Sequence, residues 1–180
     1  AGQKLHIVKT VAEGLSSGDR VLLCGENSPE WVVAYMAASL LGLVVVPVDP
    51  QTREVDIWAL CDFVEARALI ATEKRFSQLS PEGVIAHKQM SFNSIDREGM
   101  SFGGKESTDS AVGRGSWQAA RVEPDDLASI IFTSAIEPRG VELSHSNFVA
   151  NLLALAEVQG LYEQDRVLSK LPLHHALEFT

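Results

Sequence analysis

Hydroxyl, cationic and glycine residues follow one apolar run in the second half of the chain. The run 127–132 predicts a buried strand, and Thr133-Ser134 and Pro138-Arg139-Gly140 follow it. In a loop of this kind, backbone N–H groups and hydroxyls can converge on the oxygens of a phosphate. Ser144 is well placed to cap a following helix. The stretch 130–145 therefore predicts a phosphate-binding loop between a strand and a helix.

Two adjacent histidines, His174 and His175, follow the apolar stretch 167–173. They are a weak signal for a metal, because a metal pair prefers alternate or helical spacing. The sequence has no CxxC motif, no Ser-His-Asp arrangement and no carboxylates paired at a meaningful spacing. No metal site is expected, and the residues alone leave the chemistry of the histidines open.

Composition narrows the classes of partner. A chain of 180 residues can bury a core of its own, and one domain is expected, with two small lobes as an alternative. The net charge of −9, without a basic stripe, argues against nucleic acid as a partner. Cys24 and Cys61 both lie among apolar residues and are expected to be buried free thiols. Free thiols favour a reducing, cytoplasmic setting.

One uncharged stretch, 31–48, reaches the minimal length of a membrane-spanning helix. Gly42 and the β-branched run 44–46 before Pro47 instead indicate a helix that ends and a strand that begins. No transmembrane segment is therefore expected. The stretch 6–15 is too polar for the core of a signal peptide, so none is expected either.

The first part of the chain alternates strands and helices. Strands are predicted at 20–24, 43–48 and 68–71, and helices at 4–15, 29–41 and 53–66. Ser28 and Thr52 are the expected caps of the second and third helices, with Pro29 at the first helical position. Short links between these elements predict an α/β fold, a doubly wound and mostly parallel sheet flanked by helices and joined by right-handed crossovers.

The remainder is divided by a Gly- and Ser-rich stretch at 97–118. Before it, a short helix is predicted at 73–79 and weak strands at 83–86 and 91–95. After it, a short strand at 141–143, a helix at 145–159 that ends at Gly160, and a strand-like stretch at 167–173 are expected. The expected division is a first βαβ lobe at 1–96, a linker or mobile loop at 97–121, and the phosphate-loop unit at 122–180. The end of the sequence has no terminating signal, which indicates a longer protein.

Four segments, in this order, carry a resemblance to a known family. They are GDRVLLCGENSPEWVVAYMAASLLGLVVVPVDP (18–50), VEPDDLASIIFTS (122–134), EPRGVELSHSNFVANL (137–152) and DRVLSKLPLHHALEF (165–179). Together they resemble the N-terminal part of an AMP-forming acyl-CoA synthetase, of the adenylate-forming superfamily. Each segment is moderately specific, and their order and spacing strengthen the match.

The resemblance implies a two-step reaction in which a carboxylate, possibly a fatty acid, is activated by ATP and the acyl group passes to a thiol. ATP, Mg²⁺ and coenzyme A are the implied cofactors. At the positions that match the family's loop, Thr133, Ser134, Arg139 and Gly140 are the implied nucleotide-binding residues. His175 matches the histidine of the family's Pro-Leu-x-His segment. It and His174 are the implied residues of the acyl pocket.

The chain departs from the family at the centre of the loop. The family pattern Thr-Ser-Gly-Thr-Thr-Gly-x-Pro-Lys-Gly is matched here by the shorter Thr-Ser-Ala-Ile-Glu-Pro-Arg-Gly, residues 133–140. Both inner glycines, which let a backbone approach phosphates closely, and both threonines are absent. Arg139 keeps the charge of the family's lysine but is not equivalent to it. Three explanations remain open: the loop has diverged, part of it is missing from the sequence, or the likeness concerns structure alone.

These explanations leave two functions of different classes. The first is the N-terminal portion of an ATP-dependent acid–thiol ligase, whose adenine-binding, ribose-binding and C-terminal lysine motifs would lie in a further part of the protein. The alternative is an inactive relative or fragment that binds acyl groups or acts as a scaffold without ATP chemistry. A nucleotide-binding Rossmann protein outside this family is disfavoured by the missing glycine fingerprint.

Overall fold

A computed structural model describes residues 14–80, 88–91, 119–133, 139–160, 164–166, 168 and 170–175. Three predicted features lie outside these residues: the helix at 4–13, the strand at 83–86 and the Gly/Ser-rich stretch at 97–118. Gly14 and Leu15, which were expected to end the first helix, are not helical. Gly14 instead has a positive φ of 73°, which suits a turn.

The described strands form one six-stranded sheet in the order β4-β3-β1-β2-β5-β6. Its strands are β1 (Arg20–Cys24), β2 (Val44–Val48), β3 (Ala68–Ala71), β4 (Lys88–Ser91), β5 (Leu127–Phe132) and β6 (Gly140–Ser144). β1 pairs in parallel with both β2 and β3, and only the β5–β6 pair is antiparallel. The predicted doubly wound, mostly parallel α/β fold is confirmed.

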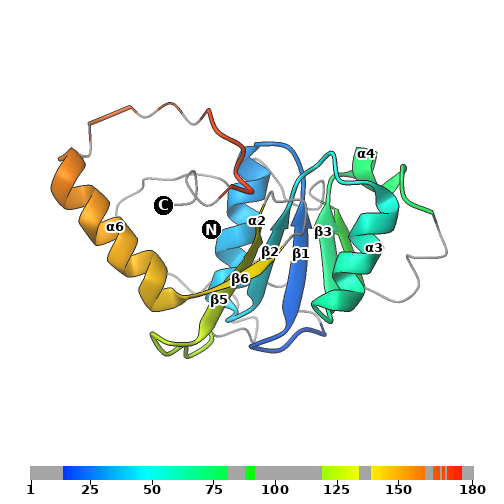
Figure 1. Cartoon of the computed structure of the whole chain (residues 1–180), viewed down its shortest axis with the longest axis horizontal. Helices are drawn as coiled ribbons and strands as arrows, with labels where there is room; N and C mark the ends of the chain where they lie inside the picture. The colour runs from blue at the N-terminus through cyan, green and yellow to red at the C-terminus, as the bar shows by residue number, and fades with distance from the viewer. Residues whose placement is uncertain are drawn as a thin grey trace, which may run out of the picture.

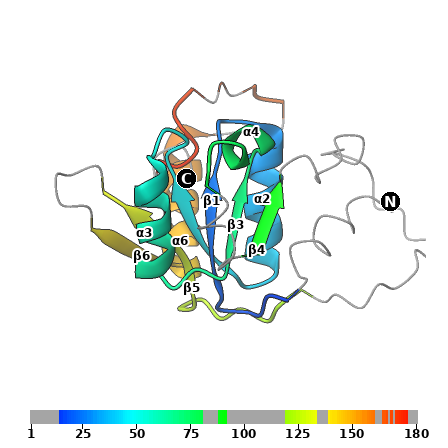
Figure 2. The same cartoon turned by 90° about the vertical axis from the view of Figure 1, so that its right-hand side faces the viewer.

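Two helices cover opposite faces of this sheet (Figures 1 and 2). α2 (Pro29–Leu40) joins β1 to β2, and α3 (Glu54–Phe63) joins β2 to β3. The short α4 (Glu73–Phe76) follows β3, and α6 (His145–Gln159) follows β6. Figure 2 looks along the sheet from the β4 side and places α2 and α3 on either side of it. Within the described residues, every helix is too short or too polar to cross a bilayer.

Strand β1 contributes to both layers of the core. Alternate side chains of a strand point to opposite faces, so Val21 and Leu23 pack on the α2 side with Trp31. Leu22 and Cys24 pack on the α3 side. The two predicted buried free thiols are confirmed there. Burial, the largest cause, together with the nearby Asp62 carboxylate, raises the pKa of the second thiol, Cys61, to about 12.

Helix caps follow the sequence in two places. The Ser28 hydroxyl accepts a hydrogen bond from the Trp31 N–H at 3.2 Å, with Pro29 at the start of α2. Ser144 and Asn147 form a reciprocal capping box at the start of α6. The same helix ends at Gly160, which has the left-handed φ of 58° that suits glycine.

The predicted Thr52 cap is wrong. α3 begins at Glu54, and Arg53 occupies the cap position without a side-chain hydrogen bond. The Thr52 carbonyl instead accepts a hydrogen bond from the guanidinium of Arg75. α3 also ends earlier than predicted, at Phe63, because the chain turns through a positive φ of 52° at Glu65.

The structure differs from the prediction at two further places. β4 begins at Lys88, where no strand was predicted and where the KQMS sequence has little apolar character. Of the weak strand expected at 91–95, Ser91 is the last residue of β4, and 92–95 lie outside the described residues. β4 nevertheless forms because the edge of β3 offers it a parallel partner. In the stretch 167–173, residues 168 and 170–173 are not in a strand. Backbone groups of Leu171 and Leu173 bond to a side chain instead of to the sheet.

The burial of Ile57 on α3 yields a test of the fold. The Ile57 side chain is fully buried, whereas Val55 on the same helix is 63% exposed. Ile57→Ala should lower the free energy of unfolding by about 2–5 kcal/mol, because it leaves a cavity in a packed layer. The matched change Val55→Ala should alter it by less than about 0.5 kcal/mol. Urea unfolding measures both, and equal effects would contradict the placement of α3.

Candidate functional site

The carboxyl ends of β1, β2 and β3 meet at one edge of the sheet. The chain leaves β1 for α2 on one face and leaves β2 for α3 on the other. A crevice opens where successive connections go to opposite faces, and ligands of open α/β sheets bind there. The loops that follow these strands were not predicted as a site, although this rule, applied to the predicted strand order, would have indicated them.

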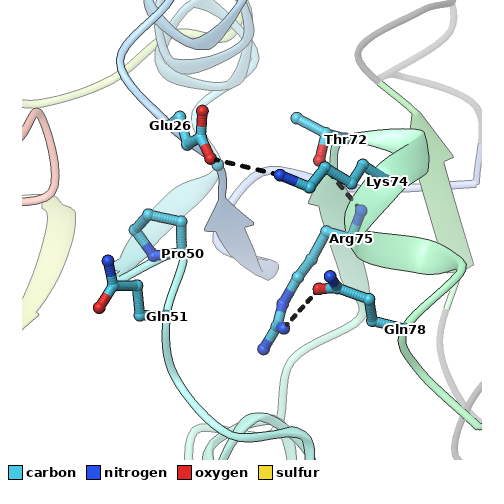
Figure 3. Close-up of a pocket in the computed structure, with 8 residues that line it drawn as sticks. Glu26, Pro50, Gln51, Thr72, Lys74, Arg75 and Gln78 are labelled. Carbon is cyan, nitrogen blue, oxygen red and sulfur yellow. Dashed lines mark hydrogen bonds and ion pairs between the residues drawn. The ribbon is translucent and has the colours of Figure 1, made fainter.

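A pocket of about 340 Å³ lies at this edge, which we call the edge pocket. Gly25 and Glu26 line it after β1, Pro50 and Gln51 after β2, and Thr72, Lys74, Arg75 and Gln78 after β3. In Figure 3 the Lys74 and Glu26 side chains point toward one another across the pocket. Polar side chains from three successive loops therefore converge on one hollow.

Two cationic side chains, Lys74 and Arg75, line the edge pocket. Lys74 Nζ lies 3.9 Å from Glu26 Oε1, and because both side chains are 79% exposed this ion pair is weak. Arg75 is held more firmly: its guanidinium donates to Gln78 Oε1 at 3.1 Å and to the Thr52 carbonyl. Burial raises the pKa of the Cys24 thiol, and the Arg75 charge partly opposes that shift. The positive charge of Arg75 therefore acts on Cys24, the last residue of β1.

The two ends of the predicted phosphate loop are hydrogen-bonded to each other. The Thr133 N–H donates to the Arg139 carbonyl at 3.0 Å, and the Arg139 N–H donates to Thr133 Oγ1 at 3.1 Å. Both residues are exposed, and Ser134 lies outside the described residues. The structure thus brings together the first and last polar positions of the predicted loop.

Gly140 has a packing role at the base of this loop. A Cβ at this position would lie 3.0 Å from Ile130 Cγ2 and 3.3 Å from Phe132 Cζ, both on the neighbouring strand β5. Those distances are tighter than ordinary van der Waals contacts. Gly140 therefore lets β6 pass close under the side chains of β5, which explains a glycine here without reference to a ligand.

The predicted histidines lie at the same edge of the sheet. His174 is largely buried, with 17% of its side chain exposed, and its Nε2 lies 3.8 Å from Asp49 Oδ2 after β2. His175 is exposed, and the two rings lie 5.3 Å apart. Burial is the main cause that lowers the pKa of His174, and the Asp49 carboxylate partly opposes it. At neutral pH His174 is therefore a neutral imidazole beside a carboxylate.

The segment 171–175, which we call the histidine segment, is attached to the sheet by Asn27 in the loop after β1. Asn27 Nδ2 donates to the Leu171 carbonyl at 2.6 Å, and the Leu173 N–H donates to Asn27 Oδ1 at 2.8 Å. Sequence reasoning did not single out Asn27 or Asp49. Their role depends on contacts more than a hundred residues away along the chain, which no local pattern reveals.

The three features occupy neighbouring strands. Along the carboxyl edge, the edge pocket lies over β3, β1 and β2, the histidine segment contacts the loops after β1 and β2, and the phosphate loop follows β5 beside β2. Within the described part of the chain, no group of three His, Cys, Asp or Glu side chains could hold a metal ion. The arrangement supplies cations, hydroxyls and an imidazole, which suit an anionic, phosphate-bearing ligand.

A model of the AMP-binding enzyme family matches residues 9–180. Among characterised relatives, an L-proline–[L-prolyl-carrier protein] ligase of Pseudomonas fluorescens is 29% identical over 168 residues, covering 92% of this chain and 32% of the relative. A medium-chain fatty-acid–CoA ligase of Escherichia coli is 28% identical over 178 residues, covering 94% of this chain and 31% of the relative. The chain therefore spans about a third of the length of these relatives.

Solved structures give the same picture of the fold. ATP-bound MatB from Rhodopseudomonas palustris matches with a TM-score of 0.78 at 21% identity, over 99% of this chain and 35% of MatB. A fatty acyl-adenylate ligase from Legionella pneumophila, solved with acyl adenylate and pyrophosphate, matches with a TM-score of 0.76 at 22% identity, over 98% of this chain and 30% of the ligase. At these identities the likeness establishes the fold alone.

The lowered pKa of His174 predicts a pH dependence of stability. The unfolded chain takes up a proton at this histidine near pH 6.5, whereas the folded chain does so only at lower pH. The corresponding stability is present above about pH 6.5 and is lost as the pH falls toward the folded pKa. Urea unfolding at pH 7.5 and 5.5 should show a smaller loss in His174→Gln than in the wild type. Equal losses in the two proteins would contradict the burial of His174.

Proposed function

This chain belongs to the AMP-binding enzyme family, and on that premise we propose that the protein activates a small-molecule carboxylate with ATP and transfers the acyl group to a thiol. The resemblance inferred from the sequence is thereby confirmed. The observation that carries the proposal is the gathering of the phosphate loop, the histidine segment and the edge pocket at one edge of the sheet. Because the chain spans about a third of its relatives, the activity is proposed for the whole protein.

The proposed reaction has two balanced steps. A carboxylate oxygen of the substrate attacks the α-phosphorus of ATP, the bond to the β-phosphate oxygen breaks, and pyrophosphate leaves from an acyl-adenylate. The sulfur of a thiol then attacks the acyl carbonyl, the bond to AMP breaks, and a thioester forms. Such steps need charge stabilisation and alignment of the reacting groups, which a protein supplies by positioning and by fixed hydrogen-bond donors.

In this proposal the phosphate loop holds the triphosphate of ATP. The mutual hydrogen bonds of Thr133 and Arg139 close the neck of the loop at the end of β5. The exposed Arg139 guanidinium can then donate two parallel hydrogen bonds to phosphate oxygens. Ser134 is proposed as a further donor. Mg²⁺ is proposed to arrive with the phosphates, since it is usually bound through substrate phosphates and only one or two carboxylates.

The edge pocket is proposed to bind the phosphorylated part of the thiol donor, for which coenzyme A is the candidate. Lys74 and Arg75 supply two positive charges to a hollow of about 340 Å³, within the range of small-molecule sites. The pocket shares the loop after β2 with Asp49, the partner of His174. A donor bound there would lie beside the histidine segment, where the acyl group is proposed to lie.

The names of the two relatives indicate which classes of substrate to consider for this protein. One is named for a prolyl group and a carrier protein, and another for a medium-chain fatty acid and coenzyme A. The carboxylate class is common to both, and a fatty acid is the finer proposal. The free thiols Cys24 and Cys61 favour a reducing compartment, which supports a cytoplasmic location. The division into 1–96, 97–121 and 122–180 is retained as a proposal.

A second candidate function is favoured by one specific observation. The loop sequence 133–140 lacks the two inner glycines and two threonines of the family pattern. Without them the backbone approaches phosphates less closely. A protein with such a loop could bind acyl groups or act as a scaffold without ATP chemistry.

Exchange of radiolabelled pyrophosphate into ATP separates the two functions. The whole protein that contains this chain is assayed with acetate, medium-chain and long-chain fatty acids and proline. Carboxylate-dependent exchange is expected, because formation of the acyl-adenylate is reversible. No exchange with any of these acids would contradict the proposed activity and support the acyl-binding alternative.

Loss of charge at the two sites should affect different steps. Arg139→Ala should slow pyrophosphate exchange about 10- to 100-fold, the size expected when a charge-assisted hydrogen bond is lost. Lys74→Ala should leave exchange unchanged and raise the KM for coenzyme A about 3- to 10-fold. Steady-state kinetics of both half-reactions measure these effects.

Arg166→Ala is the matched control, because Arg166 is an exposed arginine that neither lines the edge pocket nor belongs to the loop 133–140. It should leave both half-reactions unchanged. An Arg139→Ala protein with wild-type exchange, or a Lys74→Ala protein with reduced exchange, would contradict the division of roles.

A further inference from the structure

The Asn27 side chain is hydrogen-bonded to the backbone of Leu171 and Leu173, which are 144 and 146 residues further along the chain. Its amide nitrogen donates to the Leu171 carbonyl, and its amide oxygen accepts from the Leu173 N–H. Only one orientation of the carboxamide places a donor against the carbonyl and an acceptor against the N–H. The side chain therefore acts as a two-pronged clamp on the backbone at 171–173.

The clamp holds Leu173 in place and thereby positions His174 and His175, which follow it in the chain. Leu173, held through its N–H, also packs against the core layer on the α2 side. The His175 N–H donates to the Pro172 carbonyl at 2.9 Å, which closes a tight turn. With the turn held in this way, His174 reaches Asp49 at the end of β2.

We propose that Asn27 is a positioning residue for acyl transfer, because its carboxamide holds the histidine segment so that His174 lies against Asp49 at the carboxyl edge of the sheet. This role rests on the proposed function, in which the histidine segment lines the acyl site. Asn27 acts through the backbone of Leu171 and Leu173 and does not itself contact the reacting atoms.

The chemistry of Asn27 suits this role better than a role in the core. The residue is exposed, so hydrophobic burial does not account for it. Aspartate at the same position would keep the acceptor for the Leu173 N–H but would set a carboxylate oxygen against the Leu171 carbonyl. Alanine would remove both bonds. The two substitutions therefore remove one and two prongs of the clamp, respectively.

The imidazole of His174 reports on the clamp without any assay of activity. The charged and titratable groups that face it are Asp49 from the loop after β2 and His175 from its own segment, while the loop after β1 contributes the neutral Asn27. Docking of the segment buries His174, and this burial is the main cause of its lowered pKa. Release of the segment would return the ring to water.

The test compares Asn27→Ala, Asn27→Asp and the control Asn151→Ala in the whole protein that contains this chain. Asn151 is an exposed asparagine on α6 and takes no part in the hydrogen bonds of the clamp. Two quantities are measured for each protein: the pKa of His174 by NMR titration of histidine-labelled protein, and kcat and KM of both half-reactions. Thermal unfolding of each variant monitors the fold.

Asn27→Ala should raise the pKa of His174 toward its ordinary value and lower kcat of acyl transfer about 10- to 100-fold, the loss expected when a segment beside the reacting groups is misplaced. The KM for ATP should change less than about twofold, since the phosphate loop is untouched. Asn27→Asp should show the same directions without loss of fold, and Asn151→Ala should match the wild type. Asp49→Asn, which removes the carboxylate but keeps the clamp, should lower the pKa of His174 further.

Two results would overturn the inference. A His174 titration that is unchanged in both Asn27 variants would show that the clamp does not place the ring. A displaced titration with wild-type kcat would show that the clamp is structural and has no part in acyl transfer. Absence of pyrophosphate exchange in the wild type is a different failure, because it removes the proposed function while the titration still tests the clamp.

Discussion

The parallel pairing of β1 between β2 and β3 is the constraint on which the other features depend. All four residues Val21 to Cys24 are essentially inaccessible to water, because α2 covers one face of β1 and α3 covers the other. With both faces and both edges occupied, polar groups can approach this strand only at its ends. Parallel pairing then brings the carboxyl ends of three strands to one edge, and the opposite directions of the two crossovers leave a crevice there. The core thereby fixes where a ligand can bind, although it contributes little chemistry itself.

Polar contacts at that edge are made between segments that are distant in sequence. Asn27 and Asp49 leave neighbouring strands and together hold the histidine segment. Lys74 reaches across to Glu26, and Arg75 reaches back to the loop before α3. None of these contacts involves a fully buried charge, so each adds little to stability by itself. Their importance lies in geometry, because they place an imidazole, two cations and a phosphate-loop neck along the same edge.

The sequence predicted those parts that local patterns encode. β1 and β3 have the predicted bounds because continuous apolar runs of four or five residues are typical of strands buried on both faces. The caps Ser28 and Ser144 were predicted for a similar reason, since capping depends on residues three positions apart. Where the structure differs, a distant partner decided the outcome. Thr52 is not a cap because Arg75 binds its carbonyl, and β4 forms at an edge where its own sequence gives little indication. The histidines were indicated by their family motif, whereas the Asn27 clamp could be found only from the folded chain.

The central claim is that the ligand-binding groups of this protein gather at the carboxyl edge of the sheet, with ATP at the loop between β5 and β6. A crystal structure of the whole protein with a non-hydrolysable ATP analogue and a carboxylate substrate would test it most directly. We expect the triphosphate to contact residues 133–140 and the carboxylate to lie beside the histidine segment. A nucleotide bound at another edge of the sheet, or phosphates out of reach of Thr133 and Arg139, would contradict the account.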